Sequence, residues 1–339
     1  MISLAQVAPQ RARQRITPAM GCFALVMLSL PLWIVPVGLY DYLGVEIAIW
    51  MIYALGFNLL FGYAGLHSFG HGAYFGVGAY AFGLAQHHLG AGLWLGLASA
   101  MLAATLAGAL VGLFVSHRRG IYFALLTIAF GQVFWFVSVK WHSVTGGEDG
   151  LQNIRRPAAD FGIFAVELSD NRSFYLFVLA ILLLVIVLLW RIVHSPFGRV
   201  LQALRQNELR TRFVGYEVWR FKWAAFVLSA LVAGLAGGLF AMAQQSAYPD
   251  VMGLHQSGLV VMMTLVGGGL VSFWGPVLGV AVYFLARDLL GALTETWLLW
   301  YGLMFVLLVI FKPEGLAGWL GALRRPGPRL RAAPRRAAE

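Results

Sequence analysis

Two histidines and a serine between positions 67 and 71 have residue types and spacing that could bind a metal or support catalysis. His67 and His71 are four residues apart, so on a helix both imidazoles would share one face, and Ser68 lies close by. A zinc-protease motif also needs a glutamate between its histidines, and a serine nucleophile needs an acid to orient its histidine. Because this segment has neither, we expect no metal site and no catalytic residue here, and both imidazoles to pack or to hydrogen bond with backbone.

The chain also lacks the residues that capture a nucleotide or a coupling ion. It has only three lysines, and none completes a glycine-rich phosphate-binding loop. Ion-coupled carriers place a polar ligand near the middle of the bilayer. In this chain, few ionisable residues fall within the long apolar stretches. Arg191 and the pair Arg287 and Asp288 lie toward the ends of theirs. We therefore expect any energy for transport to come from another protein.

The composition places these residues in a membrane protein. Of 339 residues, 60% are hydrophobic and 11% are charged, and the mean hydropathy is +0.78. Soluble domains are about 45 to 50% apolar and about 25% charged, so a soluble enzyme is excluded. At about 20 residues for each crossing, the apolar residues suffice for roughly ten helices. The predicted fold class is all-α, a polytopic membrane helical bundle.

Ten apolar runs can be assigned to these helices. They cover residues 20–40, 46–62, 72–86, 91–115, 120–139, 174–193, 223–243, 258–272, 275–290 and 297–311. The runs 72–86 and 258–272 are short and rich in glycine, which allows either of them to be broken or re-entrant. The single cysteine, Cys22, lies in the first run, so no disulfide framework is expected.

Charges between the runs predict the topology. Arginines gather before the first run, after the fourth, in 195–222 and in the tail, and the positive-inside rule makes these segments cytoplasmic. The loop 140–173 carries five acids and is expected outside. Ten crossings with both termini cytoplasmic satisfy every assignment. The chain then divides into a cytoplasmic N-terminal segment (1–19), a membrane domain (20–320) and a basic, disordered cytoplasmic tail (321–339). The net charge of +10 is thus explained by topology and by contact with membrane lipid, not by nucleic acid.

A cytoplasmic amphipathic helix is predicted from Ser195 to Gly215. Ser195 can cap it, Gly215 can end it, and Glu208 can pair with Arg212 one turn later. Such a helix either lies flat on lipid headgroups or docks into a groove on a soluble partner. The missing energy source favours the partner. The residues assigned to this coupling helix are Arg199, Leu201, Leu204, Arg205, Glu208 and Arg210.

Polar residues inside the apolar runs are candidates for a solute pathway, although such residues also stabilise helix contacts. The candidates are Asn58, Ser68, His71, Thr127 and Gln132. Two glycine-rich stretches, 65–80 and 269–283, share the pattern Gly-Leu-x-Ser-Phe followed by Gly-x-x-x-Gly-x-x-x-Tyr. The shared pattern has two explanations, an internal duplication and chance.

Five motifs in fixed order resemble the LivM-type permease subunit of bacterial branched-chain amino acid ABC importers. They are Gly62-Tyr-Ala-Gly with Ser68-Phe-Gly-His71, Arg119-Gly-Ile-Tyr-Phe-Ala-Leu-Leu-Thr127, Thr145-Gly-Gly-Glu-Asp-Gly-Leu151, Ser195-Pro-Phe-Gly-Arg-x-Leu-x-Ala203-x-Arg205-x-Asn207-Glu208 and Lys312-Pro-Glu-Gly-Leu316. The resemblance covers about residues 45 to 320. The family commonly has Gln-Leu-Ser-Leu-Gly-His where this chain has Leu66-His-Ser-Phe-Gly-His71, so His67 is a departure from the family pattern.

The resemblance implies a complex in the bacterial inner membrane. Its expected partners are a second, LivH-like permease, two ABC ATPase subunits that hold ATP and magnesium, and a periplasmic substrate-binding protein. This chain would then be a transport subunit, not an enzyme, with no cofactor of its own and with a pathway at the interface between the permeases. Relatives in the same superfamily import urea or short amides, so a urea or amide permease is one alternative. A facilitator or channel that works alone is the other.

Overall fold

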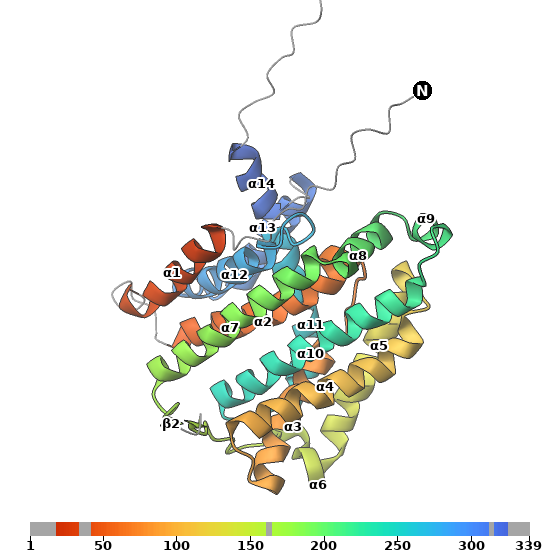
Figure 1. Ribbon diagram of the computed structural model, residues 1–339. Coiled ribbons are helices and arrows are strands. Elements are labelled where there is room, and N and C mark those ends of the chain that lie inside the picture. The colour runs from red at the N-terminus through yellow and green to blue at the C-terminus, as the bar shows by residue number, and fades with distance from the viewer. Residues whose placement is uncertain (1–17, 34–41, 161–164, 312–314, 325–339) are drawn as a thin grey trace, which may run out of the picture.

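The computed structural model describes residues 18–33, 42–160, 165–311 and 315–324, and most of them are helical (Figure 1). The sequence-based assignments for residues 1–17 and 325–339 lie outside this part of the chain. The α-helices are α1 (Pro18–Trp33), α2 (Tyr42–Asn58), α3 (Gly72–Leu89), α4 (Leu93–Val115), α5 (Gly120–Lys140), α6 (His142–Thr145), α7 (Asn171–His194), α8 (Pro196–Gln206), α9 (Glu208–Phe213), α10 (Val218–Gln244), α11 (Leu254–Gly267), α12 (Gly275–Gly291), α13 (Trp297–Phe311) and α14 (Gly315–Arg324).

Short elements complete the fold. A π-helical segment, η1 (Leu59–Ala64), continues α2, and the 3-10 helices are η2 (Gly147–Asp149) and η3 (Pro249–Met252). Strands β1 (Ala159–Asp160) and β2 (Ala165–Val166) pair antiparallel, with Ala159 opposite Val166. This hairpin is too small to change the fold class, and the prediction of an all-α helical bundle is confirmed.

Each of the ten apolar runs overlaps a helix, although residues 34–40 of the first run lie outside the described residues. Among the described residues, five helices are, by length and composition, long and apolar enough to cross a membrane: Tyr42–Ala64, Leu93–Val115, Gly120–Lys140, Asn171–His194 and Val218–Gln244. Of the two short runs, α3 is one continuous helix, whereas α11 has 14 residues and ends where Gly268 adopts φ 88°. At about 1.5 Å per residue α11 measures roughly 21 Å, less than the hydrocarbon thickness of about 30 Å. The number of crossings and the side of each terminus stay predictions.

Helix α10 forms the centre of the bundle, where it packs against α2, α3 and α4. Small residues allow these close contacts. A Cβ atom on Gly234 would collide with Ala104, and one on Gly237 would collide with the carbonyl oxygen of Phe75. Helix α5 differs, because most of its side chains are exposed or half-buried. The core therefore lies around α10, and α5 presents a free face.

Two loops bring helix starts into the interior. After η1 the chain turns at Gly65 (φ 69°), and the loop 65–71 packs against α5, where the amide of Phe69 donates to Oγ1 of Thr127 at 3.2 Å. The amide of Gly72, the first residue of α3, donates to Oγ of Ser257 near the start of α11 at 2.9 Å. Helices α3 and α11 therefore begin beside one another inside the bundle.

The two ends of the bundle carry different connections. Helices α8 and α9 lie at one end, and α6 with the β-hairpin lies at the opposite end (Figure 1). At the latter end Leu151 and Ala247 form a β-bridge, and the guanidinium of Arg156 donates to the last carbonyls of α10, those of Met242 and Ala243. The acidic loop predicted outside and the basic segment predicted inside thus lie at opposite ends, as the predicted topology requires.

Candidate functional site

The basic segment between α7 and α10 folds as two helices, so the prediction of one helix from Ser195 to Gly215 is wrong. Ser195 caps α8 as expected, since its Oγ accepts from the amide of Gly198 at 3.4 Å. The break comes at Asn207, whose backbone is extended (φ −162°, ψ 104°) and whose Oδ1 accepts from the amide of Arg210 at 2.9 Å. An asparagine that caps the next helix interrupts the preceding one, because its side chain offers the backbone another partner.

The apolar stripe of α8 faces this chain itself. Leu201 is fully buried and Leu204 is nearly so, because α8 packs against α7, α10 and η1. The interpretation of these two leucines as anchors for a partner is therefore wrong. Arg199 and Arg210 are exposed. The exposed apolar residues of this region lie on and just after α9: Leu209, Phe213 and Val214.

Arg205 connects α8 to two other segments of the chain. Its Nη1 donates to the carbonyl of Gly62 in η1 at 2.5 Å and to the carbonyl of Leu270, beyond α11, at 2.6 Å. Beside it lies a cleft of about 490 Å³ between α8, η1 and the loop that follows α11. Partial burial lowers the pKa of His67, and the charge of Arg205 lowers it further.

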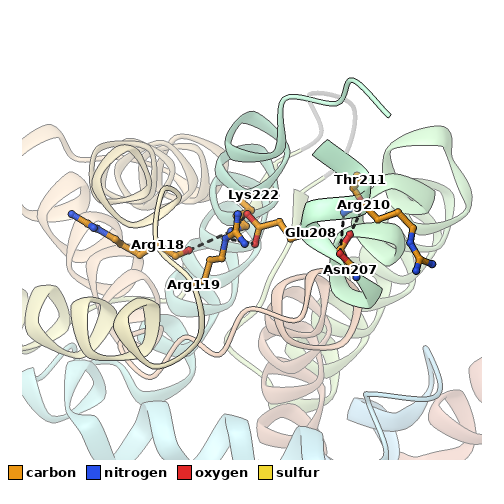
Figure 2. Close-up of polar contacts among 7 residues, drawn as sticks. All are labelled: Arg118, Arg119, Asn207, Glu208, Arg210, Thr211 and Lys222. Atoms are coloured by element: carbon orange, nitrogen blue, oxygen red, sulfur yellow. Dashed lines mark hydrogen bonds and ion pairs between the residues drawn. The ribbon is translucent and has the colours of Figure 1, made fainter. Parts of the chain in front are cut away.

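Glu208 connects α9 to the start of α5 and of α10 (Figure 2). Its two carboxylate oxygens pair with Nε of Arg119 at 3.0 Å and with Nζ of Lys222 at 2.8 Å, and Nζ of Lys222 also donates to the carbonyl of Arg118 at 3.3 Å. The expected pairing with Arg212 is wrong, because the carboxylate turns inward. Figure 2 shows Arg210 directed away from this cluster.

Four of the five pathway candidates, Asn58, Ser68, His71 and Thr127, are buried inside this chain. Ser68, His71 and Thr127 belong to or contact the loop 65–71. Thr127 accepts from Phe69 of that loop and donates to the carbonyl of Ala124 at 2.7 Å. Thr127 therefore holds the loop against α5. Gln132 lies apart from the other candidates, because it is exposed on the free face of α5.

His71 is fixed by a short hydrogen-bond chain. The hydroxyl of Ser229 on α10 donates to the carbonyl of Gly56 at 2.7 Å and lies 2.9 Å from Nε2 of His71. Because a serine hydroxyl has one hydrogen, it must accept from His71, so Nε2 carries the proton and Nδ1 does not. His71 thus bonds to a side chain instead of the backbone partner that was expected, and its Nδ1 is buried without a hydrogen-bond partner among the described residues. Among the described residues there is no group of three or more His, Cys, Asp or Glu that could hold a metal ion.

The sequence analysis missed several polar groups whose partners lie far away in the chain. Glu46 on α2 forms a two-pronged ion pair with Arg287 on α12, with 3.0 and 2.8 Å between nitrogen and oxygen atoms. An acid at the very start of an apolar run was the available signal. Ser257 and Ser229 gave no signal, because a serine in an apolar helix has no distinctive spacing.

The comparisons with known proteins agree with this architecture. Residues 39–311 match the family described as the permease component of branched-chain amino acid transport systems. The chain is 32% identical, over 79% of its length and 67% of theirs, to the high-affinity branched-chain amino acid transport permease proteins LivM of Escherichia coli and Salmonella typhimurium. A probable LivM permease of Methanocaldococcus jannaschii is 22% identical over 79% of this chain and 90% of its own length. No solved structure matches the chain. The chain is a multi-pass membrane protein and belongs to the family of branched-chain amino acid transport permeases.

Proposed function

We propose that this chain is one of two permease subunits of an ATP-binding-cassette importer that carries branched-chain amino acids across the bacterial inner membrane. The single observation that carries the proposal is the family match over most of the bundle, joined to relatives named as branched-chain amino acid permeases. The proposed partners are a LivH-like permease, two ATPase subunits that bind ATP and magnesium, and a periplasmic binding protein.

Helices α8 and α9 would receive the motion of the ATPases. Arg205 and Glu208 tie this pair of helices to η1, to the loop after α11, and to the starts of α5 and α10. The proposed contact with the ATPase is the exposed apolar surface of Leu209, Phe213 and Val214. Large apolar side chains at a basic, water-facing end of a bundle are typical anchors of a protein interface.

The solute pathway would run between the two permeases along α5. The exposed side chains of this helix repeat at the spacing of one helical face, and Gln132 is a polar residue among Leu125, Val133 and Phe136. An amide facing lipid is costly, so this face is better covered by the second permease than by acyl chains. The buried residues Asn58, Ser68, His71 and Thr127 would then support the pathway from behind.

Reconstitution of the complete complex tests the substrate. Uptake of labelled leucine should be competed by isoleucine and valine at the concentrations that saturate the binding protein. Competition by urea or a short amide, with no effect of isoleucine, would favour the urea and amide alternative. Leucine uptake by this chain without any partner would favour the stand-alone facilitator.

A further inference from the structure

Arg205 lies where the ends of two helical segments of the bundle meet. Gly62 lies in the last turn of the π-helical segment η1, where the helix leaves carbonyl acceptors unpaired, and Leu270 lies in the turn three residues beyond the end of α11. A cation at such an end is favourable because the helix dipole is negative there. Both hydrogen bonds come from Nη1, whose two hydrogens point in fixed directions in the plane of the guanidinium, so this one nitrogen serves two carbonyls.

The two segments that share Arg205, η1 and the loop after α11, are in close contact. A Cβ atom on Gly62 would lie 2.5 Å from the carbonyl oxygen of Gly269, and one on Gly269 would lie 2.6 Å from Oδ1 of Asn58. Among the described residues, the side-chain polar atoms of Asn58 and Thr264 are buried without a hydrogen-bond partner. The junction of η1 with the loop after α11 therefore covers a buried polar pair.

The ends of η1 and α11 also have similar backbone conformations. Gly65 and Gly268 adopt left-handed backbone conformations (φ 69° and 88°) at the ends of η1 and α11. A Leu-x-Ser-Phe loop that leads into the next helix follows Gly65 directly and follows Gly268 after one further residue, Gly269. Through these loops η1 leads into α3, and α11 leads into α12. A force applied to both carbonyls would thus reach four helices.

We propose that Arg205 is a positioning residue that couples α8 to η1 and to the loop after α11, so that a displacement of α8 moves these two segments together. This inference rests on the proposed function, because it presumes that a partner moves α8. An ordinary surface arginine would not do this, since a single exposed hydrogen bond leaves its two partners free to separate.

The test uses the complete complex with Arg205→Met, Arg205→Lys and the control Arg191→Met. Arg191 is an exposed arginine in the last turn of α7, just before α8. Its replacement removes the same charge without affecting a hydrogen bond to either carbonyl. The first readout is the number of ATP molecules hydrolysed for each amino acid transported. The second, in a Cys22→Ser background, is the yield of a thiol cross-link between Gln206→Cys and Val271→Cys, which line the same cleft, with and without trapped ATP.

Arg205→Met should raise the ATP cost per transported molecule at least about fivefold, the lower range of coupling between linked sites. In the Arg205→Met chain the cross-link yield should change when ATP is trapped, because α8 then moves relative to the loop after α11. In the chain that keeps Arg205 the yield should stay the same. Arg205→Lys keeps the charge but not the planar guanidinium, and it should give an intermediate number of ATP molecules per transported amino acid. It decides the question if Arg205→Met does not assemble.

Wild-type ratios and cross-link yields in the Arg205 variants that assemble would overturn the role of Arg205 and leave the proposed function intact. A wild-type complex that shows no ATP-dependent uptake would overturn the proposed function and this inference together. Loss of coupling in Arg191→Met as well would show that charge alone matters, and would also contradict the proposal.

Discussion

At the scale of single residues, Glu208 has the largest predicted effect on stability. Its side chain is 18% exposed and that of Lys222 is 4% exposed, so the Glu208→Gln variant leaves a buried ammonium without its carboxylate. Removing one partner of a buried ion pair costs about 3 to 5 kcal/mol. We expect a loss of that order in the free energy of unfolding, measured by thermal denaturation of the purified complex in detergent.

Glu217→Gln is the matched control for this prediction. Glu217 pairs with Arg220 at the surface, where both side chains are more than half exposed, and such pairs contribute about 0 to 1 kcal/mol. The double variant Glu208→Gln with Lys222→Met should recover much of the lost stability, because it removes the unpaired charge. Equal losses for Glu208→Gln and Glu217→Gln would contradict the burial argument.

The sequence identified polar residues but not their partners. Asn58, Ser68, His71 and Thr127 were recognised as polar groups in apolar surroundings, and all four are buried. Their role in packing this chain, instead of lining an interface, depends on contacts such as His71 with Ser229, 158 residues apart. Helical spacing also suggested Arg212 as the ion-pair partner of Glu208, because the i, i+4 rule considers only partners on the same helix.

At the scale of elements, α8 and α9 should respond differently to the same substitution. Leu204→Asp puts a carboxylate in the packed contact of α8 with the bundle and should destabilise the fold by about 3 kcal/mol or more. Phe213 is 88% exposed, so Phe213→Asp should change stability by less than about 0.5 kcal/mol. It should weaken ATPase binding by about 2 kcal/mol, as expected for an interface anchor.

Thermal denaturation and co-purification with the ATPase separate these two effects. A Phe213→Asp complex that assembles and transports normally would remove α9 from the proposed interface and leave lipid as the occupant of its apolar face. A Leu204→Asp chain of normal stability that fails to hold the ATPase would restore Leu204 as a direct contact.

The loop 65–71 gives a second element-scale prediction. A Cβ atom on Gly70 would collide with the carbonyl oxygen of Thr127, so Gly70→Ala must push the loop away from α5 and should cost about 1 to 3 kcal/mol of stability. Gly258, inside α11, has open space around it, and Gly258→Ala should be neutral or stabilising by up to about 1 kcal/mol. Melting temperatures of the two variants measure the difference, and equal values would contradict the close packing of the loop.

Helix positions followed from the sequence much better than helix ends did. Each of the ten apolar runs is mostly helical where the structure describes it, because burial of apolar residues and internal pairing of the backbone act on every stretch of this composition. The break at Asn207 escaped the analysis because one side-chain cap overrides an amphipathic pattern that continues through it. The early end of α11 at Gly267 was foreseen only as one of two options for a short run.

At the scale of the whole molecule, charge predicts which end faces the cytoplasm. In a Cys22→Ser background, a cysteine at Glu148 should react with an impermeant thiol reagent added outside the cell, and one at Arg210 should react only after the membrane is opened. Arg210 belongs to α9, and Glu148 closely follows α6, which lies at the opposite end of the bundle (Figure 1). Reaction of both from the outside, or of Glu148→Cys only from the inside, would show that the positive-inside assignment is wrong.

The fold class and the family could be predicted from the sequence, because composition and motif order are properties of the chain alone. The assembly could not, because the proposed partner surfaces, the free face of α5 and the exposed side chains of α9, form only after the bundle has folded around α10. The energy source of the assembly is the central claim that remains open to direct measurement.

That measurement is the uptake of labelled leucine into proteoliposomes that contain the complete complex and its binding protein. With ATP and magnesium on the side of α8 and α9, leucine should accumulate against its gradient, and without ATP no accumulation should occur even when a proton or sodium gradient is imposed. Accumulation driven by either ion gradient in the absence of ATP would contradict the account of this chain as an ATP-driven permease subunit.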